Sequence, residues 1–112
     1  LERMLQGRLL SGEASAEMLR ILGDQRLNGK MPFYLHSRGI DCAHKTGEDE
    51  GITHDVGIIW TPSPWIFCFL SSETNVPAAE RVIQDVAAML AEVDSEWEPG
   101  EVYHGEGTDA IV

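Results

Sequence analysis

Apolar residues recur at helical spacing in the last third of the chain. Between residues 77 and 93 they return every three or four positions, which is typical of one face of an amphipathic helix. Asn75 can cap this helix, and Pro77 falls near its first turn, where the missing N–H costs little. An apolar stripe needs another element to cover it, and the expected partner is a sheet. The stripe consists of Ala79, Val82, Ile83, Val86, Met89, Leu90 and Val93.

Three runs before this helix have the character of β-strands, at about residues 40–46, 52–60 and 65–70. In the second run, the apolar residues Ile52, Val56, Ile58 and Trp60 all fall on alternate positions, as in a strand. The third run is apolar throughout, which is typical of a strand covered on both faces. The link between the last two runs is short and rich in proline, so it favours an antiparallel hairpin.

The first part of the chain has a helical pattern. A first helix is predicted from residue 1 to about residue 9, and a second is predicted to end at Gly23. Either Ser11 or Ser15 can cap the start of the second helix. Residues 24–39 are less regular, and we expect a short helix or loop there that leads into the sheet.

These elements predict an α+β fold in which an antiparallel three-stranded sheet packs against helices. The expected domain covers residues 1–93, with helices in 1–35, the sheet in 40–72 and the C-terminal helix in 77–93. Residues 94–112 are rich in acids and contain several glycines, so we expect them to form an acidic, mobile tail.

Composition limits the classes of partner. The 112 residues carry a net charge of −11, so nucleic acid and anionic membranes are not expected partners. No run approaches the roughly 20 apolar residues of a membrane helix. The cysteines Cys42 and Cys68 do not have the spacing of zinc ligands. A disulfide between them stays open if their strands are neighbours.

The segment with the clearest chemical content is Lys45-Thr46-Gly47, which we expect to close the first strand ahead of an acidic turn. Lys45 can supply a fixed positive charge and Thr46 a hydroxyl near a sheet edge. Gly47 lets a ligand approach the backbone closely. Such a strand end can bind a carboxylate and present backbone N–H groups to a developing oxyanion.

The order of these features resembles the C-terminal part of class A β-lactamase-related, penicillin-recognising serine hydrolases. In that family a Lys-Thr-Gly strand accompanies Ser-x-x-Lys and Ser-Asp-Asn motifs. The similarity covers about residues 1–93 and implies a partial β-lactamase/transpeptidase-like fold. It also implies a small substrate, a β-lactam or a related amide or ester, for the intact protein, and it implies no cofactor. Relatives of this kind are commonly periplasmic or secreted, although the location of this chain stays unknown.

The resemblance assigns roles to individual positions. Lys45 and Thr46 would hold the carboxylate of the substrate, and Gly47 would complete this substrate-binding strand. The backbone N–H of Glu48 would form one arm of the oxyanion hole. Asp55, on the next strand, would have a structural role.

The 112 residues also depart from the family pattern. They contain no Ser-x-x-Lys, no Ser-Asp-Asn and no assignable deacylating Glu, so we expect this chain alone to be inactive. A missing N-terminal segment would explain the gap, and an exposed sheet edge would favour reassembly with that segment or self-association into a homo-oligomer. The side chain of Glu48, if it faces the site as Thr46 does, would oppose a carboxylate substrate.

Two other interpretations stay open. The chain could belong to a non-catalytic binding or scaffold protein with the same fold, which the absent nucleophile favours. A metal site built from His44, His54, Asp55 and the Glu48–Glu50 run is the weaker alternative, because no recognised ligand spacing occurs. We expect no metal.

Overall fold

A computed structural model of the chain describes residues 1–96 and contains five helical segments and three strands in this range. None of the helices described is long and apolar enough to cross a membrane. In chain order the elements are α1 (Glu2–Leu5), α2 (Gly12–Gly23), α3 (Pro32–Leu35), a 3₁₀ turn (His36–Arg38), β1 (Cys42–Asp49), β2 (Ile52–Ile59), β3 (Trp65–Phe69) and α4 (Val76–Glu96).

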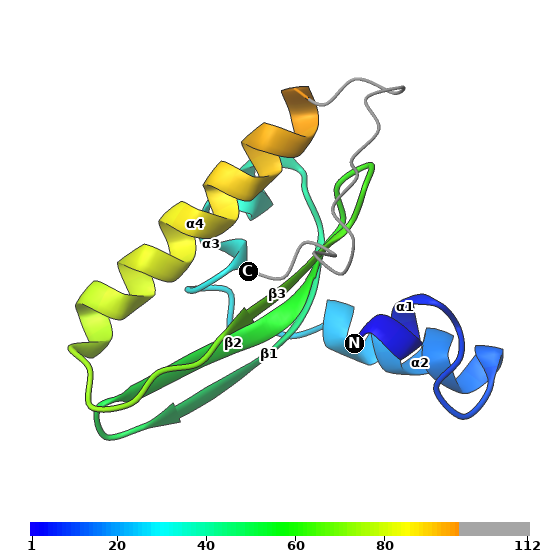
Figure 1. Cartoon of the computed structure of the whole chain (residues 1–112), viewed down its shortest axis with the longest axis horizontal. Helices are drawn as coiled ribbons and strands as arrows, with labels where there is room; N and C mark the ends of the chain where they lie inside the picture. Colours follow the sequence, from blue (N-terminus) through cyan, green and yellow to red (C-terminus); the bar gives the residue numbers. More distant parts are fainter. Residues whose placement is uncertain (97–112) are drawn as a thin grey trace, which may run out of the picture.

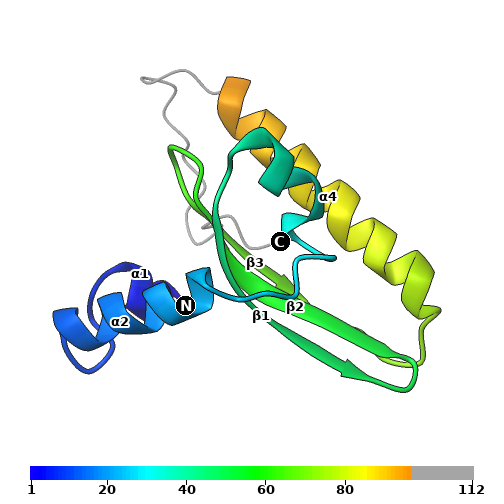
Figure 2. The same cartoon turned by 180° about the vertical axis from the view of Figure 1, so that it is seen from behind.

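The three strands form one antiparallel sheet in the order β1-β2-β3, so the predicted α+β class and sheet are confirmed. The β1–β2 hairpin turns at Gly51, whose φ of 67° lies in the left-handed region that favours glycine. Helix α4 crosses one face of the sheet, with α3 beside it (Figure 1). The pair α1 and α2 lies away from α4, near the start of β1 (Figure 2).

The core lies between the sheet and α4, and α3 closes it. Buried small residues of α4 let the helix backbone approach the sheet, while larger side chains from the strands and from α3 fill the remaining space. The buried cluster comprises Met31, Leu35, Ile59, Phe67, Ile83, Ala87, Leu90 and Ala91.

Only part of the apolar stripe of α4 is buried. Ile83 and Leu90 are buried, whereas Val82, Met89 and Val93 are 49%, 55% and 53% exposed. The prediction that the sheet covers the whole stripe is therefore wrong for these three residues. A sheet of three strands touches the helix along one line, and the stripe is wider than that line.

The apolar alternation in β2 does not mark the face that packs against α4. On that face Thr53, Asp55 and Ile59 are fully buried, and Ile58 is buried on the opposite face. Both faces of this central strand are therefore largely covered. The buried polar side chains are tolerated because each has a hydrogen-bond partner.

The N-terminal segment differs from its predicted form. Helix α1 ends at Leu5 and not near residue 9, and the chain turns back through positive φ angles at Gly7 and Leu10. The Ser11 hydroxyl caps α2 by accepting a hydrogen bond from the Ala14 N–H at 3.0 Å. Ser15 is buried and its hydroxyl bonds both backbone groups of Leu9, at 3.0 and 2.9 Å. Tertiary hydrogen bonds therefore replace the predicted end of the first helix.

The C-terminal helix is longer than predicted. It continues to Glu96, so residues 94–96 are helical and do not belong to a tail. The predicted mobility of the remaining tail concerns residues 97–112, which lie outside the described part of the chain.

The two cysteines are not bonded to each other. Strand β2 separates β1, which carries Cys42, from β3, which carries Cys68, and both thiols are free. Burial raises the pKa of the Cys42 thiol to about 12, and the nearby carboxylates of Asp55 and Asp41 act in the same direction.

The cysteines should therefore differ in reactivity. With iodoacetamide at pH 8, we expect the exposed Cys68 of the 112-residue chain to be alkylated at least about tenfold faster than Cys42, because the thiolate is the reactive form. Peptide mass spectrometry over a time course measures both rates. Equal rates under native conditions would contradict the burial of Cys42, and denaturant should make the two rates converge.

Gly57 is the glycine that the packing of the sheet requires most. A Cβ at this position would collide with the Ala43 carbonyl oxygen and would come within 2.7 Å of the Met31 side chain. We therefore expect Gly57→Ala to lower the free energy of unfolding by at least about 2 kcal/mol. Urea denaturation followed by circular dichroism measures the change.

Gly23→Ala provides the matched control, because nothing lies within 4 Å of the Cβ that it adds. Its effect should stay within about 1 kcal/mol, and alanine in a helix can even be stabilising. If both variants unfolded at the same urea concentration, the close contact at Gly57 would be refuted.

Candidate active-site edge on strand β1

The Lys45-Thr46-Gly47 segment lies inside β1. The strand continues to Asp49, so the prediction that this motif closes the strand is wrong. The longer hairpin forms because Glu48 and Asp49 pair with Thr53 and Ile52. Strand β1 is an outer strand of the sheet, and no strand among residues 1–96 pairs with its free edge.

Backbone groups of Glu48 point to that free edge. The Trp60 N–H donates to the Asp41 carbonyl at 3.0 Å, and pairs along an antiparallel ladder alternate between bonded and non-bonded. Residues at even positions of β1 therefore turn their N–H groups away from β2. Thr53, the register partner of Glu48, agrees, because its N–H and its carbonyl both bond the Ser71 hydroxyl. The Glu48 N–H is thus available to a group that lies beside the strand.

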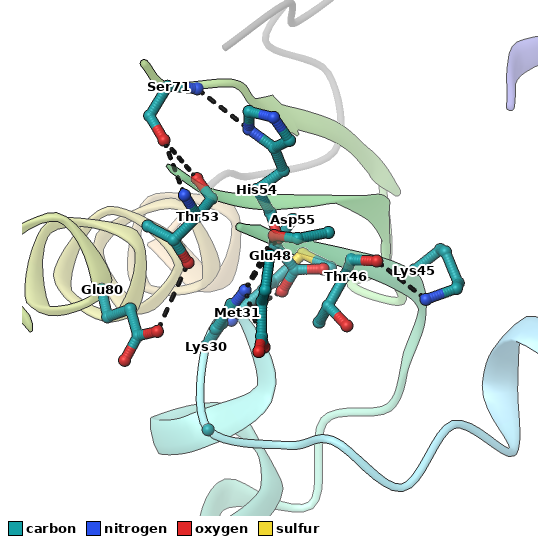
Figure 3. Close-up of polar contacts among 12 residues, drawn as sticks. Lys30, Met31, Lys45, Thr46, Glu48, Thr53, His54, Asp55, Ser71 and Glu80 are labelled. Carbon is teal, nitrogen blue, oxygen red and sulfur yellow. Dashed lines mark hydrogen bonds and ion pairs between the residues drawn. The ribbon is translucent and has the colours of Figure 1, made fainter. Parts of the chain in front are cut away.

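The side chains of the motif lie on both faces of β1. Thr46 and Glu48 share one face, as alternation predicts; Thr46 is 9% exposed and the Glu48 side chain is 59% exposed. Lys45 is exposed on the other face, and its Nζ donates to the Thr46 carbonyl at 2.8 Å (Figure 3). Because β1 is an edge strand, a ligand beside it can reach groups on both faces.

Lys30 is a site residue that the sequence analysis missed. Its side chain is 5% exposed, and its Nζ lies 3.3 Å from the Gly47 carbonyl oxygen, 3.1 Å from that of His54 and 3.2 Å from Glu48 Oε1 (Figure 3). A buried lysine needs such partners, since its charge is otherwise costly to desolvate. The position sits in an irregular segment, where no periodicity indicates that it turns inward. The ion pair also offsets the charge of Glu48, which the sequence analysis treated as unopposed.

Asp55 ties three segments of the fold together. It is fully buried, and its Oδ1 accepts a hydrogen bond from His44 Nδ1 at 2.9 Å while its Oδ2 accepts one from the Met31 N–H at 2.9 Å. His44 on β1, Asp55 on β2 and the segment that leads into α3 are therefore joined directly next to Lys45. The other ring nitrogen of His44, Nε2, is buried and has no partner within the described range.

A second polar network stabilises the β1–β2 hairpin near its turn. The Ser71 N–H donates to His54 Nδ1 at 3.0 Å, which places the proton of the neutral His54 ring on Nε2. The Thr53 hydroxyl donates to Glu80 Oε1 of α4 at 3.3 Å. These contacts account for His54 as a structural residue of the hairpin.

The described residues contain no group of three or more His, Cys, Asp or Glu side chains that could hold a metal ion. A surface cavity of about 420 Å³ lies at the opposite end of β1, where Arg20, His36 and Trp60 are among its lining residues. It does not include residues 45–48, whose free strand edge is called the candidate ledge below.

The chain belongs to the β-lactamase enzyme family, whose model matches residues 1–93. The fold is similar to that of a β-lactamase from Sphaerobacter thermophilus, with a TM-score of 0.73, 28% identity and coverage of 88% of this chain. It is also similar to PBP-A, with a TM-score of 0.69, 23% identity and coverage of 85% of this chain, which shows the fold alone. No curated protein matches the chain.

The chain spans only part of the length of these solved proteins, 39% of the Sphaerobacter enzyme and 37% of PBP-A. Membership of the family confirms the resemblance predicted from the Lys-Thr-Gly strand and its surroundings. The individual roles of Lys45, Thr46, Gly47, Glu48 and Asp55 stay predictions.

Removal of the Asp55 carboxylate should be costly. Asp55→Ala leaves the Met31 N–H and the His44 ring without their acceptor, so we expect the free energy of unfolding to fall by about 3 kcal/mol. Asp55→Asn retains one carbonyl oxygen and should cost less than the alanine variant. Chemical denaturation measures both.

Glu50→Ala is the control, since it removes an exposed carboxylate from the neighbouring turn, and we expect a change within about 0.5 kcal/mol. Similar losses for Asp55→Ala and Glu50→Ala would show that Asp55 does not join these segments.

Proposed function

We propose that the intact protein is a β-lactamase-like serine hydrolase and that the free edge of β1 forms one wall of its active site. The substrate would be a β-lactam or a related amide or ester. The observation that carries this proposal is the Lys-Thr-Gly strand at a sheet edge that pairs with no other strand of residues 1–96, with the Glu48 N–H turned outward, in a chain of this family.

In this mechanism a serine hydroxyl attacks the carbonyl carbon of the substrate and the C–N or C–O bond breaks, with a proton passing to the leaving nitrogen or oxygen. An open-chain amide or an ester releases an amine or alcohol, whereas in a β-lactam the ring opens and the amine stays attached to the acyl group. Water then hydrolyses the acyl-enzyme to a carboxylic acid and regenerates the serine. The Glu48 N–H would donate to the negative oxygen that develops on the carbonyl, an interaction whose loss typically costs about 3 kcal/mol of transition-state stabilisation.

The side chains beside this N–H would bind and orient the substrate. Lys45 is exposed and retains N–H donors beyond the one bonded to Thr46, so it can attract an anionic group. The Thr46 hydroxyl can donate a hydrogen bond to the same group. Gly47 has no side chain that would hold a ligand away from the strand, and the nearest neighbour of an added Cβ would be His54 at 3.3 Å.

We further propose that the nucleophile comes from polypeptide outside these 112 residues, because no Ser-x-x-Lys occurs among them. The chain spans 39% of the Sphaerobacter β-lactamase, which leaves room for such a segment in a protein of that length. The 112-residue chain alone would then be inactive, since an oxyanion donor without an activated hydroxyl forms no acyl-enzyme.

The exposed apolar residues of α4 support a partner segment. Val82, Met89 and Val93 are about half exposed on one side of the helix, and Leu70 after β3 is 72% exposed. A missing segment of the intact protein, or a second copy of this chain, would bury them. Light scattering at micromolar concentration tests this, and a stable monomer of the 112-residue chain would contradict self-association.

The function is tested by hydrolysis of a chromogenic cephalosporin. We expect turnover by the longer protein that includes a Ser-x-x-Lys helix and none by the 112-residue chain. In the longer protein, Lys45→Ala should lower kcat/KM at least about a hundredfold, because it removes the cation at the ledge. Glu50→Gln, with an exposed side chain on the same hairpin, is the control and should change kcat/KM less than about twofold.

The rival interpretation is a non-catalytic binding or scaffold relative, which the missing nucleophile motif favours. It predicts a longer protein without a Ser-x-x-Lys, and mass spectrometry would detect no acyl adduct after incubation with a β-lactam. An adduct on an upstream serine would exclude the rival, and its absence together with no turnover would overturn the hydrolase proposal.

A further inference from the structure

The Glu48 carboxylate forms an ion pair with the Lys30 ammonium group, which is buried beneath the candidate ledge. An ammonium group has three N–H donors, and Lys30 faces three acceptors, the carbonyl oxygens of Gly47 and His54 and the Glu48 carboxylate. Two of these acceptors are backbone atoms of the hairpin and cannot leave without opening it. Glu48 is therefore the only one of the three that a side-chain movement can displace.

The third donor of Lys30 is paired with a carboxylate that lies at the protein surface. The Lys30 side chain is 5% exposed, but the Glu48 side chain that covers this donor is 59% exposed. Glu48 also supplies the backbone N–H of the proposed oxyanion hole, so its side chain lies directly beside the substrate position. An external anion at the ledge would have to compete with a carboxylate that is already attached to the protein.

Acidic side chains around this point weaken the attraction that Lys45 offers to an anion. Lys30 and Lys45 bring two positive charges, while Glu48, Asp49 and Glu50 bring three negative ones, and Asp49 and Glu50 are exposed on the same hairpin. The other titratable groups nearby are already engaged, because His44 bonds Asp55, His54 bonds Ser71 and Glu80 bonds Thr53.

We infer that Glu48 is a specificity-determining residue. Its carboxylate pairs with the Lys30 cation and so directs the site toward substrates that are uncharged at the position where penicillins carry a carboxylate. This inference rests on the proposed hydrolase function and narrows its substrate class to neutral esters or amides. Its physical basis is discrimination by an opposing charge and an occupied hydrogen-bond donor.

The experiment compares benzylpenicillin with its methyl ester, two β-lactams that differ in the charge of one group. In the longer, complete protein we expect a higher kcat/KM for the ester. Glu48→Gln should raise the ratio of kcat/KM for the free acid to kcat/KM for the ester about tenfold, mainly through the KM of the free acid, because an amide binds Lys30 weakly and bears no charge.

Two controls distinguish the effect of the Lys30–Glu48 ion pair from the effect of the negative charge of the hairpin as a whole. Glu50→Gln removes the same charge from the same hairpin without touching Lys30 and should change the ratio of the two kcat/KM values less than about twofold. Adding Lys30→Met to Glu48→Gln should abolish most of the gain for the free acid, provided that circular dichroism shows a folded protein.

The outcomes decide the inference separately from the hydrolase function. A wild-type preference for the free acid, an equal effect of Glu48→Gln on both compounds, or an equal effect of Glu50→Gln would overturn it. If the protein turns over neither compound, the hydrolase proposal fails, and calorimetric binding of the same compounds decides the inference. Tighter binding of the free acid by Glu48→Gln alone supports it, and unchanged or undetectable binding in every variant refutes it.

Discussion

The structure of the candidate site depends on the buried carboxylate of Asp55. A carboxylate without water around it is costly, and it is stable here because it accepts hydrogen bonds from the His44 ring and from the Met31 N–H, each at 2.9 Å. Those two bonds hold β1 against β2 and bring the segment before α3 onto the sheet. The position of Lys45 and Thr46 on the edge strand follows from this arrangement, since His44 directly precedes them.

The same segment carries the second buried charge. Once the Met31 N–H is held by Asp55, the preceding residue, Lys30, lies against the hairpin, where two backbone carbonyls and Glu48 surround its ammonium group. One loop thus contributes a backbone donor to β2 and a cation to the parts of β1 and β2 that flank their turn. The bond between Asp55 and Met31 positions the loop on the sheet, and the loop in turn places the Lys30 charge beside Glu48.

Much of the fold could be predicted from periodicity. The amphipathic pattern of residues 77–93 located α4, and the apolar runs with their short proline-rich link located three antiparallel strands. The predictions that failed were those that tertiary contacts decide. Helix α1 stops at Leu5 because the Leu9 backbone bonds Ser15, and three of the seven residues of the α4 stripe stay exposed because the sheet is narrow. Lys30 was missed because an irregular loop shows no pattern of burial.

The sequence by itself determined the elements, the family and the Lys-Thr-Gly strand, because these depend on residue type and on spacing along the chain. Only the tertiary structure decided which groups face one another. It turned the Glu48 N–H to the free edge, placed Asp55 between His44 and Met31, and brought Lys30 to Glu48 across many intervening residues. Such contacts depend on turn geometry, which helps to set strand register, and on the path of a loop, and neither of these is encoded in local hydrophobic periodicity.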